Sequence, residues 1–166
     1  MELRIQKLSN SHKKSDFDSE RPLLDNYIRN QAKQDVTRDL SACYVLVDSS
    51  QKVIGYYTLS SNSISKVGFP EDLLKKLPPS YTALPTVLLG RLAVDKGHKR
   101  RGYGTLLLTD ALNRCVALSE DLGILAVVVD PVDDAAVQFY NSFGFILLPS
   151  TRKMFIPIKT IQASMP

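Results

Sequence analysis

The spacing of apolar and polar residues along the chain predicts strands and helices in a mixed order. Residues 3–8 alternate weakly and predict a first strand. Apolar positions then recur at helical spacing over residues 21–34, where Pro22 suits a first turn, so we expect an amphipathic helix. Two β-type runs, 42–47 and 53–60, flank a polar turn and predict an antiparallel hairpin.

The second half of the chain predicts a strand–helix–strand unit. The elements expected are, in order, a short helix over 71–77, a strand entered at Pro85, a helix over 104–122, a buried strand over 124–129, a short helix over 135–142 that Asp133 or Asp134 caps, and strands over 145–148 and 153–158. The long helix should bury the stripe Leu108, Ala111, Cys115, Leu118 and Leu122. A hairpin followed by a right-handed crossover unit indicates a mixed sheet in an α/β domain.

Composition narrows the class of protein. With 166 residues, 44% of them hydrophobic, the chain fits a single domain over 1–166. No apolar run approaches the ~20 residues of a membrane span, and no apolar block of a signal peptide follows the first residues, so we expect a cytoplasmic protein without membrane association. Cys43 and Cys115 lie in apolar stretches without metal-ligand spacing, which predicts reduced core thiols and no metal. The net charge of +4 allows a polyanionic partner without requiring one.

The stretch 88–108 combines an apolar run, a basic glycine-bearing loop and the start of a helix. Such a helix start directs backbone N–H groups and a positive dipole end to one point, which suits a phosphate. A Walker loop is excluded because Tyr103 and Gly104 follow Gly102 where lysine and a hydroxyl belong. The dinucleotide fingerprint fails because Leu107 replaces its third glycine.

The remaining loop sequence, Lys99-Arg100-Arg101-Gly102-Tyr103-Gly104, resembles the Gln/Arg-x-x-Gly-x-Gly/Ala loop of the GNAT N-acetyltransferases, with Lys99 as a departure. Residues 89–95 resemble the family's fourth strand, and residues 133–145 resemble its second cofactor motif, with Asp133 in place of the usual Asn. The resemblance implies the GNAT acyl-CoA N-acyltransferase fold, a mixed central sheet with flanking helices and a splayed cofactor cleft between strands four and five.

The resemblance also implies a set of site residues. Acetyl-CoA would be bound by Leu92, Ala93, Val94, Lys99, Arg100, Arg101, Gly102, Tyr103, Gly104, Thr105, Asp133, Ala136 and Phe139. The pantetheine arm would pair with main-chain groups near Leu92 and Val94, where an N–H would stabilise the oxyanion formed during acetyl transfer. Tyr140 would be the general acid for the CoA thiolate, because a phenol with a pKa near ~10 is neutral at pH 7.

No general base is evident in the sequence. None of the four glutamates lies near the fourth strand, where many amine acetyltransferases have one, and Arg91 is found there instead. Asp95 follows that strand, and we expect it to form bonds within the turn. A lysine amine with a pKa near ~10.4 needs deprotonation, whereas an α-amine near ~7.7–8.0 is largely neutral. An α-amine acceptor is therefore favoured, although a water chain or an unrecognised Asp would also supply the function.

A narrower resemblance points to the same acceptor. Residues 24–35, 55–59 and 90–95 are similar to the GNAT toxins of bacterial toxin–antitoxin systems, although Phe17-Asp18-Ser19-Glu20 replaces the usual Phe-x-Cys-Gly. This similarity implies acetylation of the α-amine of aminoacyl-tRNA, a block of translation and a ribbon-helix-helix antitoxin. We expect no DNA binding by the chain on its own, and a homodimer is left open.

The basic residues divide into two sets under this interpretation. Candidates for tRNA contact are Arg29, Lys33, Arg38 and Arg91, with Lys66, Lys75 and Lys76 in the variable segment; a solvated charged face is the alternative. Lys96, His98, Lys99, Arg100 and Arg101 flank the cofactor loop and are expected to meet CoA phosphates. Two other functions stay open, a protein-lysine or polyamine-like amine acetyltransferase and a non-enzymatic CoA-binding domain.

Overall fold

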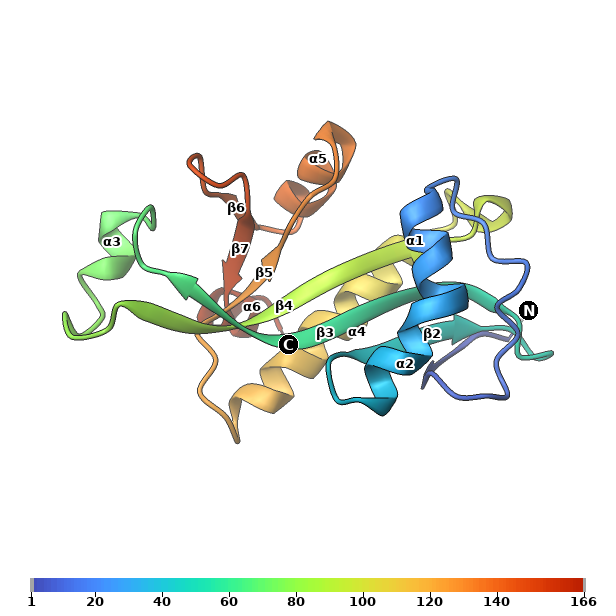
Figure 1. Ribbon diagram of the computed structural model, residues 1–166. Coiled ribbons are helices and arrows are strands. Elements are labelled where there is room, and N and C mark those ends of the chain that lie inside the picture. Colours follow the sequence, from blue (N-terminus) through green and yellow to red (C-terminus); the bar gives the residue numbers. More distant parts are fainter. Residues whose placement is uncertain (1, 166) are drawn as a thin grey trace. The chain divides into compact units, whose positions relative to one another are not determined.

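The computed structural model describes residues 2–165 and contains one mixed, seven-stranded sheet (Figure 1). The strand order is β1-β2-β3-β4-β5-β7-β6, with β1 at Arg4–Lys7, β2 at Ala42–Val47, β3 at Val53–Ser65, β4 at Ala83–Val94, β5 at Ala126–Val129, β6 at Ile146–Leu147 and β7 at Met154–Pro157. The helices are α1 (Pro22–Asn26), η1 (Tyr27–Gln31), α2 (Ala32–Thr37), α3 (Glu71–Leu74), η2 (Lys96–His98), α4 (Tyr103–Ser119), α5 (Asp134–Ser142) and α6 (Ile158–Ser164). The expected α/β class is confirmed.

The chain divides into two compact units. The first contains residues 1–60 and 89–111, and the second contains residues 61–88 and 112–166. The long strands β3 and β4 and the helix α4 each contribute residues to both units. The assignment of the whole chain to one domain stays a prediction.

In the first unit, a helical segment covers an antiparallel three-stranded meander. β1 pairs with β2 from Arg4 opposite Val47, and β2 pairs with β3 through the predicted hairpin. The core beneath the helices joins apolar side chains of both layers, among them Phe17, Ile28, Val45 and Tyr56. Every one of these four side chains is almost fully buried, which supplies the hydrophobic driving force for the unit.

The predicted helix over 21–34 is correct in place but contains an unpredicted π-turn, η1. The apolar side chains Leu24, Ile28, Ala32 and Val36 all pack on the same core at a constant spacing of four residues. In a regular α-helix each step of four advances ~40° around the axis, so three steps would carry the stripe away from the core. The wider π-turn compensates this drift, and the helical segment continues to Thr37, three residues beyond the prediction.

The second unit has its own core between β5, β7 and the segment around α3. Phe69 and Phe155 are in ring contact with centroids 4.7 Å apart, and Ala126 and Val128 of β5 lie in the same cluster. The Leu125 N–H donates to Pro85 O at 2.9 Å, so the four residues of β5 run beside the first half of β4. The strand predicted to be entered at Pro85 begins two residues earlier, at Ala83, so Pro85 lies inside β4.

Several predicted boundaries are wrong at their ends. α4 stops at Ser119 rather than residue 122, and Leu118 and Leu122 of the predicted stripe are exposed, whereas the buried face is continued by Leu112 and Val116. β3 runs five residues beyond residue 60. The C-terminal helix α6, which buries Ile158 and Ile161, was missed because seven residues are too few for a clear periodicity.

Other sequence predictions agree with the structure. Cys43 and Cys115 are free and buried, and burial raises the pKa of each thiol to about 12. Asp133, rather than Asp134, caps α5 by accepting the Ala136 N–H at 2.8 Å. Across residues 2–165, no helix combines the length and the apolar character that crossing a bilayer requires.

Gly55 on β3 permits a close approach between three elements of the first unit. A Cβ at this position would lie 2.8 Å from the Leu107 side chain of α4 and 3.0 Å from the carbonyl oxygen of Ala93 on β4. Because Ala93 belongs to the strand expected to meet the cofactor, the size of residue 55 also controls the position of that strand.

We predict that Gly55→Ala lowers the free energy of unfolding by about 1–3 kcal/mol, because the added methyl overpacks this contact. Gly123→Ala is the matched control: its Cβ would have no heavy atom within 4 Å, so its effect should stay within about 0.5 kcal/mol. Urea unfolding of both variants measures the difference. Equal stability of the two variants would contradict the role of Gly55.

Candidate functional site

The basic loop between β4 and α4 adopts two left-handed backbone conformations. Arg100 has φ +65° and Gly102 has φ +80°, and α4 begins directly afterwards at Tyr103. Glycine adopts positive φ readily, while an arginine there stores strain of the kind found at functional sites. A Cβ on Gly102 would have no heavy atom within 4 Å, so the glycine is required by its backbone conformation rather than by crowding.

The start of α4 fits an anionic group such as a diphosphate. Leu106 donates its N–H to Gly102 O at 3.0 Å, and the N–H groups of the preceding first turn, Tyr103 to Thr105, are directed out of the helix by its geometry. The helix dipole adds positive potential at the same end. The side chains of Arg100 and Arg101 are exposed beside this turn, which completes a donor set suited to phosphate oxygens.

Lys99 and Lys96 have their ammonium groups engaged inside the chain. Lys99 donates to Ser19 O at 3.0 Å and to the Glu20 carboxylate at 3.2 Å. Lys96 pairs with Asp18 at 3.1 Å. Their predicted contact with CoA phosphates stays a prediction, and the structure shows that both also fasten the loop to the segment that precedes α1.

Asp95 is buried and forms the bonds within the turn that its position predicted. Its Oδ1 accepts the Asp18 N–H at 3.0 Å, while Oδ2 accepts the Gly97 N–H at 3.1 Å and lies 3.2 Å from His98 Nδ1. The His98 side chain is partly buried in this contact instead of being exposed. Asp95 therefore bonds both within the turn and to the segment before α1.

Arg91 lies on β4 and faces the helical segment of the same unit. Its guanidinium carbon is 3.5 Å from the centroid of the Tyr27 ring, a cation–π contact. The Tyr27 hydroxyl donates to Asp35 at 2.7 Å, and burial, with this hydrogen bond, raises the pKa of Tyr27 to about 12. Tyr27 is the first residue of the π-turn, so this unpredicted turn positions the ring that contacts Arg91.

The other predicted tRNA contacts of this unit differ in their surroundings. The Arg29 guanidinium on η1 donates to Phe17 O, so this exposed residue also anchors the segment before α1. Lys33 on α2 is partly buried, and Arg38, just after α2, is exposed. Leu92, Ala93 and Val94 occupy the last residues of β4 as predicted.

In the second unit, α5 carries the predicted second motif. Asp133 caps the helix, Ala136 and Phe139 are partly buried, and Tyr140 is 8% exposed. The Tyr140 ring meets Phe139 and Phe145 edge-on, with centroids 5.3 Å apart in both pairs. This apolar cage raises the pKa of Tyr140 to about 12 through burial of the phenol. Tyr140 therefore keeps its proton throughout the physiological range.

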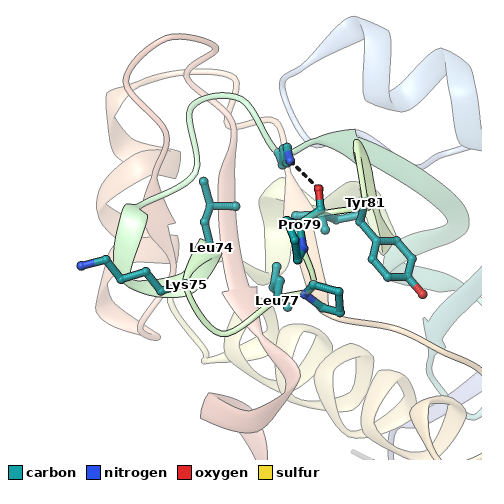
Figure 2. A pocket seen from close by; sticks show the side chains of 8 residues that line it. Leu74, Lys75, Leu77, Pro79 and Tyr81 are labelled. Atoms are coloured by element: carbon teal, nitrogen blue, oxygen red, sulfur yellow. Dashed lines mark hydrogen bonds between the residues drawn. The ribbon is translucent and has the colours of Figure 1, made fainter.

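Two of the lysines from the variable segment line one pocket of about 360 Å³ (Figure 2). Lys66 donates to Pro79 O at 3.2 Å, and Figure 2 shows Lys75 and Tyr81 directed outward at opposite ends of the pocket. The floor and wall are apolar or proline, and none of its lining residues is acidic. Lys76 instead lines a second groove of about 460 Å³, and Leu77 lines both.

The structure thus groups the predicted residues by unit. The cofactor loop, Arg91 and the basic residues of the first helical segment belong to the first unit, while the α5 motif and the lysine pocket belong to the second. Sequence reasoning missed Tyr27, Asp35 and the acceptor role of Asp25, which binds Ser19. Only the constant spacing of four along the helix would have signalled the π-turn that positions Tyr27.

Comparison with known proteins gives consistent matches. The sequence model of the "Acetyltransferase (GNAT) family" matches residues 5–145 of this chain. A "tRNA-acetylating toxin" of Mycobacterium tuberculosis (strain ATCC 25618 / H37Rv) is 33% identical over 87% of this chain and 84% of its own length. A structure of a tyrosine-to-phenylalanine mutant of KacT superposes with a TM-score of 0.93 at 28% identity, covering 99% of this chain and 100% of that one.

AtaT is a third similar protein. Its complex with acetyl-methionyl-tRNAfMet has a TM-score of 0.91 at 28% identity, with 98% of both chains covered. Another structure holds AtaTR bound with acetyl-CoA, with a TM-score of 0.85 at 28% identity over 97% of this chain and 96% of that one. In a third, an AtaT toxin mutant is bound to the C-terminus of the antitoxin AtaR, with a TM-score of 0.84 at 25% identity over 98% and 96%.

We predict that the Tyr140 phenol titrates about two pH units above an ordinary tyrosine, because its charged form is desolvated. With ¹³C-labelled tyrosine, the Tyr140 resonance, assigned by its loss in Tyr140→Phe, should keep its neutral shift up to pH 10.5. A midpoint at or below pH 10 would show that the phenol is solvated and would contradict the apolar cage.

Proposed function

Because the chain belongs to the GNAT acetyltransferase family, we propose that it is a toxin that uses acetyl-CoA to acetylate the α-amine of aminoacyl-tRNA and so blocks translation. The observation that supports this acceptor is the bonding of the carboxylate at the end of β4. Asp95 accepts two backbone N–H groups and lies 3.2 Å from His98 Nδ1, which favours an amine that needs little deprotonation. The tRNA-acetylating relative and the AtaT complex with acetyl-methionyl-tRNA support the same acceptor.

Acetyl-CoA would be held by two kinds of group. The amides of Arg100 to Thr105 and the exposed guanidinium groups of Arg100 and Arg101 suit its diphosphate, while Ala136 and Phe139 would line its path on α5. Main-chain groups of Leu92 and Val94, at the end of β4, would hold the pantetheine arm. The bound cofactor supplies an activated acetyl thioester.

Tyr140 acts as the general acid in this proposal. Its phenol holds a proton at neutral pH and can donate it to a thiolate leaving group. Because this phenol stays protonated throughout the physiological range, it is available as an acid when the thiolate leaves.

The acceptor side would be formed by the helical segment and the basic side chains. Arg91, held over Tyr27, presents a fixed cation on β4, and Arg29, Lys33 and Arg38 extend positive charge along the helices. In the second unit, Lys66 and Lys75 flank a pocket that contains the exposed Tyr81, a combination suited to phosphates and a stacked base. These contacts would make the KM for tRNA dependent on salt.

The proposed toxin would act in the cytoplasm, where charged tRNA is available, and an antitoxin would restrain it. The AtaT toxin mutant bound to the C-terminus of AtaR supports a protein antitoxin, and the resemblance found in the sequence specifies a ribbon-helix-helix protein. A homodimer is compatible with the proposal.

The proposal is tested by incubating the purified protein with labelled acetyl-CoA and charged tRNA. Label should enter charged but not uncharged tRNA, and alkaline release should return it as an N-acetylated amino acid. Spermidine and a lysine-rich protein are included as alternative acceptors. Efficient labelling of either alternative, without labelling of any charged tRNA, would refute the toxin proposal and favour an amine acetyltransferase of the same fold.

For the proposed acid, we predict that Tyr140→Phe lowers kcat by about a hundredfold or more while acetyl-CoA binding changes less than about twofold, because only the transferable proton is lost. Tyr44→Phe removes the hydroxyl of a tyrosine on β2 that is as buried as Tyr140 and lies outside the proposed site, so it serves as the control. Single-turnover kinetics and isothermal titration measure the two quantities. An unchanged rate in Tyr140→Phe would remove this residue from the mechanism.

For the cofactor loop, we predict that Gly102→Ala weakens CoA binding about fivefold or more, since an alanine at φ +80° costs about 1 kcal/mol and displaces the neighbouring amides. The loop change should leave the second unit intact. Gly123→Ala, a glycine without positive φ, is the control. Titration calorimetry with CoA distinguishes them; equal affinities would show that the loop amides do not bind the cofactor.

A further inference from the structure

The Asp95 carboxylate joins two segments that are far apart in the sequence. One oxygen accepts the Asp18 N–H, ahead of α1, and the other accepts the Gly97 N–H at the start of the cofactor loop. The residue is only 9% exposed, so these charge-assisted bonds are formed away from most of the solvent. No step of the proposed reaction uses this carboxylate.

Further bonds join the same two segments. The Lys96 N–H donates to Asp18 O at 2.7 Å, and the Lys99 ammonium donates to Ser19 O at 3.0 Å. The ion pairs of Lys96 with Asp18 and of Lys99 with Glu20 are largely exposed and contribute little by themselves. The buried carboxylate of Asp95 is therefore the strongest element of this junction between residues 17–20 and 95–99.

On its other side, the segment 17–20 holds the helical segment of the proposed acceptor face. Ser19 donates its N–H and its hydroxyl to the buried Asp25 of α1 at 2.8 and 2.6 Å. Arg29 of η1 donates to Phe17 O. Hydrogen bonds on both sides of residues 17–19 therefore connect the cofactor loop, through Asp95 and this short backbone segment, to α1 and the π-turn.

We infer that Asp95 is a positioning residue that couples the cofactor loop to the acceptor helix, so that CoA bound at the loop restrains residues 17–31. This inference rests on the proposed function, because it assigns the loop to CoA and the helix to the acceptor. By thermodynamic reciprocity, an acceptor bound at the helix tightens the binding of CoA by the same factor. The two substrates are thus recognised cooperatively.

Hydrogen–deuterium exchange with CoA alone tests the inference without an acceptor. In the wild-type protein, saturation with CoA should slow exchange of the amides in residues 17–31 by about fivefold or more. In Asp95→Asn, which cannot accept from both segments, the slowing should fall below about twofold at a CoA concentration that saturates the variant. Equal slowing in both proteins, or none in the wild type, would overturn the inference.

Asp48→Ala is the control for a purely structural effect. Asp48 also caps a turn, where its Oδ1 accepts the Ser50 and Lys52 N–H groups at 2.9 and 3.0 Å, but it lies in the β2–β3 hairpin. Alanine removes this acceptor, so the variant should lose thermal stability and keep the full CoA effect on residues 17–31. Loss of that effect in Asp48→Ala would overturn the specific role of Asp95.

Ser19→Ala tests the other end of the connection if Asp95→Asn folds poorly. It removes the hydroxyl bond to Asp25 but leaves the Asp95 carboxylate and the loop intact. We expect CoA affinity within about twofold of wild type together with reduced slowing at residues 21–31; full slowing would overturn the inference. If charged tRNA is not acetylated while CoA still slows exchange at residues 17–31, the proposed acceptor fails and the coupling stands.

Discussion

The turn from β4 into α4 constrains the rest of the first unit. It must end a strand, pass through two left-handed residues and begin a helix whose first N–H groups are directed to one anion. Such a turn cannot be stabilised by apolar burial, because its groups have to remain accessible to a ligand. Asp95 provides the alternative, a buried carboxylate that accepts one N–H from the turn, at Gly97, and one from the segment before α1, at Asp18.

The chemistry proposed for the protein depends on desolvation more than on charge. Tyr140 has no charged neighbour among the causes of its raised pKa, and its apolar cage alone keeps the phenol protonated. An acceptor that arrives as a neutral amine fits such a site, because it brings no charge that must be desolvated.

The sequence predicted the order of elements because strong periodicities and turn residues mark most of them. Local patterns correctly predicted the hairpin at 42–60, the α5 cap at Asp133 and the loop before Tyr103. Local patterns did not predict the π-turn, the positive φ of Arg100 or the ends of α4, because each of these is decided by packing or by contacts with distant segments. For the site, motif residues were found on the predicted elements, whereas the contacts of Asp95 with Asp18 and of Arg91 with Tyr27 are non-local and leave no signal in spacing.

Two of the places where the chain departs from the usual family pattern are in contact in the structure. The lysine at the first position of the cofactor loop, Lys99, contacts the backbone of Ser19 and the carboxylate of Glu20, which belong to the segment that replaces Phe-x-Cys-Gly. A flexible ammonium can reach both acceptors at once, and Glu20 itself has the left-handed φ of +69° that this bend requires. Because each departure supplies one side of this contact, we expect the residues at positions 20 and 99 to covary among relatives.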